Sequence, residues 1–252
     1  DAGTLTISGV VAGGNTDNLT KVGSGTLILS GNNTYVDVTT ISAGTLIAAA
    51  NNALGTTGDP TTVASGATLG FQGGITYSTA EAVTINGTGS SSLGAINNVS
   101  GVNSFAGAVT LGSASTIESQ SGTLTLSGAI ANGGFLLTAG GPSNITISSV
   151  ISGTGGLTKD DAGTVTLSGT SANTYSGVTT VNDGILVLSK TAGVNAVPTA
   201  LTIGNASGAA NSAEVQLNAA NQIAAVTVTI NNDGLLDLNN NSDTIGALAM
   251  TG

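Results

Sequence analysis

Residues 19–47 read LTKVGSGTLILSGNNTYVDVTTISAGTLI, and residues 157–187 read LTKDDAGTVTLSGTSANTYSGVTTVNDGILV. The two stretches match along their length, with two residues inserted after Gly169. Internal repetition on this scale is typical of proteins that stack one structural unit on the next. We take the following matched positions as structural repeat residues: Lys21, Gly25, Gly31, Tyr35 and Gly44 in the first stretch, and Lys159, Gly163, Gly169, Tyr175 and Gly184 in the second.

A shorter unit underlies the long repeat. It is a glycine followed by about five residues in which Thr or Ser alternates with Leu, Ile or Val, and it ends on another glycine. This alternation has a period of two, which places the aliphatic side chains on one face of a half-buried strand and the hydroxyls on the other. The clearest copies are GTLTISG at 3–9, GTLILSG at 25–31, GTLTLSG at 122–128 and GTVTLSG at 163–169.

Short strands separated by turns suit a sandwich, a barrel or a β-solenoid. A sandwich core of this length usually draws on large aromatic residues, and this chain has only three Tyr, three Phe and no Trp. A solenoid needs one narrow interior in which like residues stack on like. We therefore predict an all-β, right-handed parallel β-helix of about 10–12 coils, roughly 50–60 Å long, with the hand taken from the general preference of parallel crossovers. The Ala-rich segment 218–225 is predicted to be a turn region rather than a helix.

Composition excludes several classes of function. Charged residues make up 6% of the chain, and 13 acids against three lysines give a net charge of −10. Nucleic acids and anionic lipids are recognised largely through Lys and Arg, so neither is an expected partner. Because His, Cys and Arg are absent, Ser-His-Asp and Cys-His catalytic groups and imidazole or thiolate metal sites cannot be built. No apolar run approaches the ~20 residues of a membrane-spanning helix.

The long repeats resemble the passenger-associated transport repeats of bacterial autotransporters, also called autotransporter-associated β-strand repeats. The shared pattern is Leu-x-Lys, then Gly-Thr-Leu-x-Leu-Ser-Gly, then Asn-Thr-Tyr-x-Gly-x-Thr-x-Ile and a closing Gly-x-Leu, and Asp37 departs from it where Gly177 conforms. The resemblance implies a β-helical passenger that is secreted or displayed on the bacterial surface after export through an outer-membrane barrel. It also implies that folding of the repeats assists translocation.

Domain organisation follows from the repeats. We expect residues 1–252 to form a single β-helix segment, with repeat motifs at 19–47 and 157–187 and with coils continuing beyond both ends. The opening DAGTLTISG matches DAGTVTLSG at 161–169, a point inside the long repeat, and the chain closes on Met250, Thr251 and Gly252 without a polar cap. Since a bare terminal coil exposes strand edges, the expected partner is self, either end-to-end stacking or further coils of the same chain.

Few side chains are candidates for chemistry. Lys21 and Lys159 are expected to be exposed or snorkelling lysines at coil corners, with a ligand contact as the alternative. Tyr35 and Tyr175 are expected at the edge of the core, stacked on the next coil, with surface recognition as the alternative. The adjacent Asp160 and Asp161 are expected in a solvated turn rather than in a catalytic site.

Motifs for two kinds of binding surface are absent or incomplete. No calcium-loop motif of the type D-x-[DN]-x-[DN]-G is present, so no specific metal or cofactor is expected. Thr-x-Thr pairs, such as Thr123 with Thr125 and Thr164 with Thr166, suggest a hydroxyl array that could order ice, but the pairs do not recur in successive coils.

The function predicted from the sequence is a non-enzymatic extracellular scaffold, as a β-helical stalk, adhesin shaft or fibre-forming segment. The alternatives are a carbohydrate-binding adhesin face and a polysaccharide-degrading β-helix enzyme. The corresponding alternative partner is a cell-surface glycan or protein receptor.

Overall fold

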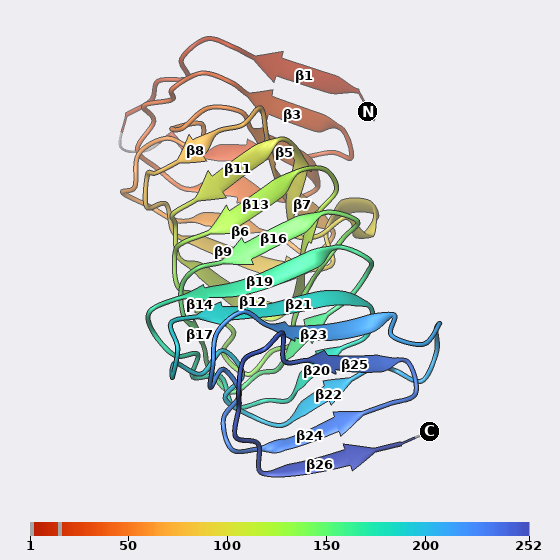
Figure 1. Ribbon diagram of the computed structural model, residues 1–252. Coiled ribbons are helices and arrows are strands. Elements are labelled where there is room, and N and C mark those ends of the chain that lie inside the picture. The colour runs from red at the N-terminus through yellow and green to blue at the C-terminus, as the bar shows by residue number, and fades with distance from the viewer. Residues whose placement is uncertain (1–2, 15–16, 252) are drawn as a thin grey trace.

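The computed structural model describes residues 3–14 and 17–251, and these wind into a parallel β-solenoid of about 11 turns. Its two termini lie at opposite ends of the stack of coils (Figure 1). Within the described residues the only helical segment is a 3₁₀ turn, η1 (Ser90–Ser92), and no helix is long and apolar enough to cross a membrane. The predicted all-β parallel helix is confirmed, and the Ala-rich segment 218–225 contains no helix, as expected.

The strands stack in three columns that run along the solenoid, and every strand pairing is parallel. Column 1 contains β2 (Leu19–Lys21), β4 (Thr39–Ile41), β6 (Thr61–Val63), β9 (Val83–Gly87), the first part of β12 (Val109–Ser119), β14 (Ile130–Ala131) and β17 (Ile151–Ser152). Column 2 contains β1 (Thr4–Ile7), β3 (Thr26–Leu29), β5 (Gly44–Ala48), β7 (Ala67–Gln72), β10 (Ile96–Ser100), the second part of β12, β15 (Leu137–Gly140), β18 (Leu157–Lys159), β20 (Thr179–Val181), β22 (Leu201–Ile203), β24 (Thr227–Ile230) and β26 (Ala247–Met250). Column 3 contains β8 (Thr76–Tyr77), β11 (Val102–Phe105), β13 (Thr123–Leu126), β16 (Asn144–Ile147), β19 (Thr164–Gly169), β21 (Gly184–Lys190), β23 (Ala213–Leu217) and β25 (Gly234–Asp237).

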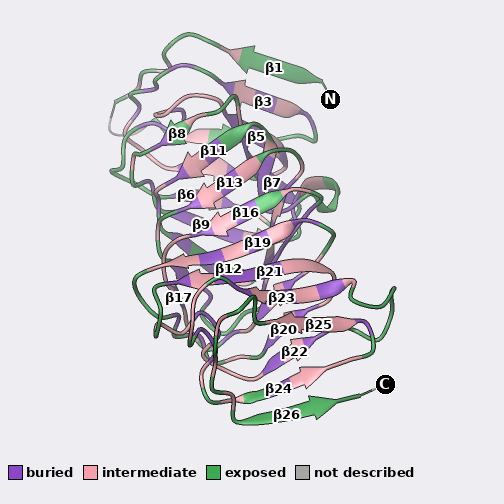
Figure 2. Ribbon diagram, in the orientation of Figure 1, coloured by how far each residue is buried: buried purple, intermediate pink, exposed green. Residues whose placement is uncertain are grey.

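The core is a continuous stack of aliphatic side chains inside the coils. Figure 2 shows buried residues along the strands of the middle coils, whereas β1 and β26 at the two ends are largely exposed. In column 3, for example, Leu124 pairs with Ile145 and Ile145 pairs with Val165, and all three are fully buried or nearly so. Alternation explains this burial, because every second residue of a strand points inward. Full burial of such a side chain contributes about 1.5–3 kcal/mol.

Three buried aromatic side chains form a cluster in the interior. The rings of Phe71, Tyr77 and Phe105 form one cluster with centroid separations of 5.2–6.3 Å. The coil that runs through η1 contains more residues than the coil before it. Leu69 pairs with Ile96 at the two ends of the η1 coil, and Leu46 pairs with Leu69 at the two ends of the preceding coil.

Threonines form single files on the outside of the solenoid, and two of these files run over five or more coils. The Thr-x-Thr pairs do not repeat from coil to coil, in agreement with the sequence analysis. Single threonines do repeat, because the register pairs a threonine of one coil with a threonine at the same position of the next coil. The file in column 1 contains Thr20, Thr40, Thr62, Thr84 and Thr110, and the file in column 2 contains Thr116, Thr138, Thr158, Thr180, Thr202 and Thr229.

Candidate functional site

Lys159 ties one coil corner to the next. It ends β18, has no exposed surface, and donates hydrogen bonds from Nζ to the backbone carbonyls of Asp160 (2.7 Å), Asp161 (2.6 Å) and Asp183 (2.8 Å). The first two carbonyls belong to its own corner and the third to the corner of the following coil. Burial lowers the pKa of Lys159 to about 8, against the opposing attraction of the nearby Asp161, Asp160 and Asp183 carboxylates.

Lys21 makes the same contacts in the first repeat. Its Nζ donates to the carbonyls of Val22 (2.9 Å), Gly23 (2.7 Å) and Ala43 (2.9 Å), and the side chain is 7% exposed. The lysines therefore lie at coil corners, as predicted, but the expectation that they are exposed is wrong. Three carbonyl acceptors satisfy the ammonium group, and this compensates for its removal from water.

The closing glycine of each repeat makes room for the lysine. Gly44 and Gly184 both have a φ of +67°, a conformation that side-chain-bearing residues rarely adopt. A Cβ atom at Gly44 would lie 2.8 Å from Lys21 Nζ, and one at Gly184 would lie 2.7 Å from Lys159 Nζ. The lysine and the glycine of each repeat therefore pack together at one corner. We call each of these pairs, Lys21 with Gly44 and Lys159 with Gly184, a lysine staple.

The other repeat glycines also stand where coils approach closely. A Cβ atom would collide with the carbonyl oxygen of the neighbouring coil at Gly31, Gly163 and Gly169, and Gly169 has in addition a φ of +100°. Gly25 is buried, and its carbonyl accepts the N–H of Thr45 at 3.2 Å.

The repeat tyrosines lie in the core. Tyr35 is 2% exposed and Tyr175 is 1% exposed, and their hydroxyls hydrogen-bond the Oγ1 atoms of Thr39 (2.9 Å) and Thr179 (2.6 Å). Gly55 of the next coil packs against the Tyr35 ring, since a Cβ there would lie 2.8 Å from Cε2. Burial raises the pKa of Tyr35 to about 12 and raises that of Tyr175 as well. The predicted core position is confirmed.

Sequence reasoning missed an asparagine that bridges three coils in each repeat. Asn33 Oδ1 accepts the N–H of Val11 (2.8 Å), and its Nδ2 donates to the carbonyl of Ala53 (2.6 Å). Asn173 does the same with Ile151 (2.9 Å) and Ala196 (2.8 Å). The signal was present in the sequence, because both repeats contain Asn-Thr-Tyr.

Lys190 also holds a corner, although it lies beyond the aligned repeats. It ends β21, is 2% exposed, and donates to the carbonyls of Ser149 (3.1 Å) and Ser168 (2.9 Å) on two preceding coils. All three lysines of the chain are therefore used to bind backbone carbonyls.

The two repeats occupy different faces of the solenoid. The first has its Leu-Thr-Lys strand, β2, in column 1 and its Gly-Thr-Leu strand, β3, in column 2. The second has the corresponding strands, β18 and β19, in columns 2 and 3. The second repeat is thus rotated by one column about the solenoid axis, while its internal contacts are retained. The contacts of the repeat therefore join successive coils, whichever face of the solenoid the repeat occupies.

Acidic side chains line a cavity of about 410 Å³ at another corner. Its lining includes Glu118, Gln120, Pro142 and Asp161. The exposed Asp161 accepts the N–H of Gly141 at 2.9 Å, in agreement with its predicted place in a turn. Burial raises the pKa of Glu118 to about 6, repulsion from Asp161 adds to the rise, and a hydrogen bond from Gln120 opposes it.

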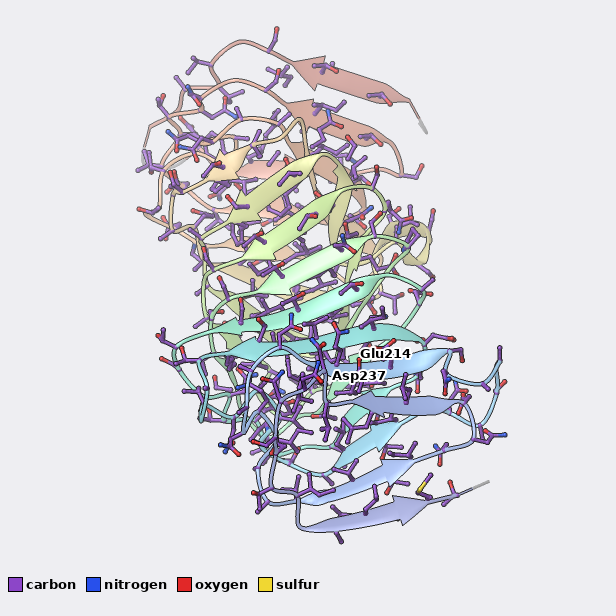
Figure 3. The ribbon with its side chains drawn as sticks, in the orientation of Figure 1. Glu214 and Asp237 are labelled. Atoms are coloured by element: carbon purple, nitrogen blue, oxygen red, sulfur yellow. The ribbon has the colours of Figure 1, made fainter. Side chains whose placement is uncertain are left out.

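A second group of acids faces solvent on column 3. Glu214 of β23 and Asp237 of β25 stand on neighbouring strands (Figure 3), and Asp237 is paired with Gln216 rather than with Glu214. Both are partly exposed. Within the described ranges, no three acidic side chains converge closely enough to hold a metal ion.

Comparison with protein families gives one match, to the passenger-associated-transport-repeat family, over residues 19–48 and 157–188. These are the stretches that carry the lysine staple, the bridging asparagine and the buried tyrosine. The resemblance inferred from the sequence is confirmed at both repeats. No curated protein and no solved structure matches the chain.

Proposed function

We propose that this chain, a β-helix segment of the type found in autotransporter passengers, acts as a rigid non-enzymatic stalk. The observation that supports this role is unbroken coil-to-coil pairing along column 2, from β1 to β26. The pairing is reinforced at the corners by lysine staples and by the bridging Asn33 and Asn173. In a solenoid each coil contacts only its neighbours, so stiffness depends on these nearest-neighbour links.

Electron microscopy and small-angle X-ray scattering of the purified chain test the stalk. At about 4.8 Å per coil, the described turns predict a rod on the order of 50 Å long. Uniform rods of that length would support the proposal, whereas compact spheres would overturn it.

We propose further that coils stack on coils at the ends of this segment, so that the partner is self. β1 is paired with β3 and β26 with β24, and β26 exposes Leu248 and Met250 at 55% and 76%. A parallel strand edge of this kind accepts another strand, either from the same polypeptide or from a second copy. Mass measurement of the native protein separates the two sources. Replacing Leu248 with Asp should abolish any filaments formed by a chain of this length.

The location that we propose is extracellular or at the bacterial outer surface, since passenger repeats are typical of secreted or surface-exposed proteins. Buried lysines and hydroxyl-rich outer faces offer proteases few accessible cleavage sites, which is consistent with a location outside the cell. Protease treatment of intact producing cells, followed by blotting for this segment, tests the location. A segment that is seen only after cell lysis would contradict it.

A carbohydrate-binding face is the second candidate function, favoured by the cavity between Glu118 and Asp161. Carboxylates accept hydrogen bonds from sugar hydroxyls. Most glycosidases also use a pair of carboxyl groups for catalysis. A glycan array with the native chain and the Glu118→Gln variant tests binding, and product analysis with the same polysaccharides tests hydrolysis. Binding that is unaffected by the substitution would exclude this cavity.

A further inference from the structure

Four acidic residues form a single file along one corner of the solenoid. Each stands two residues before a strand of column 1, and the register pairs Leu19 with Thr39, Thr39 with Thr61 and Thr61 with Val83. The members of this acidic file are Asp17, Asp37, Asp59 and Glu81. Neighbouring members belong to adjacent coils, whose strands lie about 4.8 Å apart.

Among the described residues, no lysine pairs with the acidic file. Each of the three lysines donates to backbone carbonyls at a different corner, and Lys21 does so at the far end of the strand that follows Asp17. Burial of Glu81 strengthens the repulsion between its carboxylate and that of Asp59. A bound cation or a proton on Glu81 would relieve this repulsion.

Glu81 supplies an independent sign of a missing ligand. It is 1% exposed, and its Oε1 accepts a hydrogen bond from Thr61 Oγ1 at 2.8 Å, so the side chain reaches back toward the coil of Asp59. Its Oε2 is buried without a hydrogen-bond partner, as is Oδ2 of Asp37. Buried carboxylate oxygens are normally satisfied, and Asp233, also 1% exposed, shows how this chain does it. Asp233 accepts the N–H groups of Asn205, Ala206 and Ser207.

We propose that the acidic file binds a divalent cation of the Ca²⁺ class between successive coils, with Asp59 and Glu81 as its principal carboxylate ligands. Ca²⁺ takes six to eight oxygen ligands in flexible geometry. Since no three carboxylates of the described residues converge on one point, each cation is held by two neighbouring carboxylates. Hydroxyl, carbonyl and water oxygens complete the shell.

The test uses the full chain after dialysis against EDTA. Calorimetric titration with CaCl₂ at pH 7.5 measures binding, and thermal unfolding in CaCl₂ is compared with NaCl and MgCl₂ at equal ionic strength. We expect Ca²⁺ to bind, to raise the melting temperature more than NaCl does, and to slow amide exchange around residues 36–39, 58–62 and 80–84.

Matched variants locate the site. Asp59 is exposed, so Asp59→Asn should fold and should weaken Ca²⁺ binding by about tenfold or more. Glu214→Gln removes an acid on column 3 and should bind Ca²⁺ as the parent chain does. The proposal is overturned if CaCl₂ acts no differently from NaCl, if Glu214→Gln loses as much affinity as Asp59→Asn, or if acid stabilises these coils while Ca²⁺ does not.

Discussion

The ammonium nitrogen of Lys159 lies 2.7 Å from the point that a Cβ atom would occupy at Gly184, and Lys21 stands in the same relation to Gly44 at 2.8 Å. The two pairs lie in different columns of the solenoid and share their geometry nonetheless. Because the contact between the lysine and the glycine is the same on both faces, it depends on the repeat sequence and not on the column that the repeat occupies. Predictions about the lysine staple should therefore hold equally for both repeats.

Replacing Gly184 with Ala should destabilise the fold by about 3 kcal/mol, because strain from the positive φ is added to a collision with Lys159 and with carbonyl oxygens. The matched control is Gly193→Ala, since Gly193 has a φ of +81° with nothing within 4 Å of its Cβ position. It should lose only about 1 kcal/mol from backbone strain. Urea unfolding measures both, and equal losses would contradict the close-packed corner.

Replacing Lys159 with Met should cost about 3 kcal/mol, since three carbonyl oxygens lose their donor while the aliphatic stem is kept. Thr158→Ala, at the neighbouring outward-facing position, should change the free energy of unfolding by less than about 1 kcal/mol. Amide exchange should localise the loss to the corners at 160–163 and 182–184. A loss spread evenly over the chain would speak against a local staple.

Replacing Asn173 with Ala should cost about 2 kcal/mol, because a buried N–H and a buried carbonyl lose their partners on two different coils. Asn33→Ala should have a similar effect. Asn32→Ala is the control, because Asn32 is exposed and the second repeat has Ala172 at the matching position. The prediction fails if Asn32→Ala and Asn33→Ala have equal effects in chemical denaturation.

Glu81→Gln should stabilise the chain at pH 8 in EDTA and should have little effect at pH 4. The pKa of Glu81 is raised from 4.5 to about 7, so the folded state holds its proton more tightly than the unfolded state does. This contribution is fully present below pH 4.5 and is lost as the pH rises through 7. The gain at pH 8 should be on the order of 1–3 kcal/mol. Thermal unfolding from pH 4 to pH 8 checks it, and a gain that is the same at every pH would refute the assignment to Glu81.

Native protein should resist a lysine-specific protease. The chain has three lysines and no arginine, and Lys21, Lys159 and Lys190 are 7%, 0% and 2% exposed. Lys159 and Lys190 end strands that are paired on both sides, and Lys21 ends β2, which is paired with β4. Cleavage requires local opening of these strands. Mass spectrometry should show an intact chain under conditions that cut the urea-unfolded chain at all three lysines. A variant with an exposed lysine, such as Asn32→Lys, should be cut at that position without denaturant.

The sequence alone was sufficient for the strands, the parallel coil and the equivalence of the two repeats. Alternation of small hydroxyl residues with Leu, Ile and Val predicts a strand with one buried face and one exposed face. Near-identical segments are expected to make the same local contacts. The corner position of Lys21 and Lys159 and the core position of Tyr35 and Tyr175 followed from the same reasoning. Burial of the lysines did not, because it depends on carbonyl groups that the next coil supplies.

Only the tertiary structure decided which residues of different coils meet. A residue's neighbour in the next coil depends on the length of every loop between them, and the coil through η1 is longer than its neighbours. The second repeat lies one column further round the solenoid than the first, although its sequence matches. The same register aligns Asp17, Asp37, Asp59 and Glu81 into one acidic file. In the sequence these four residues are isolated acids, and they become a site only because the coil lengths bring them into line.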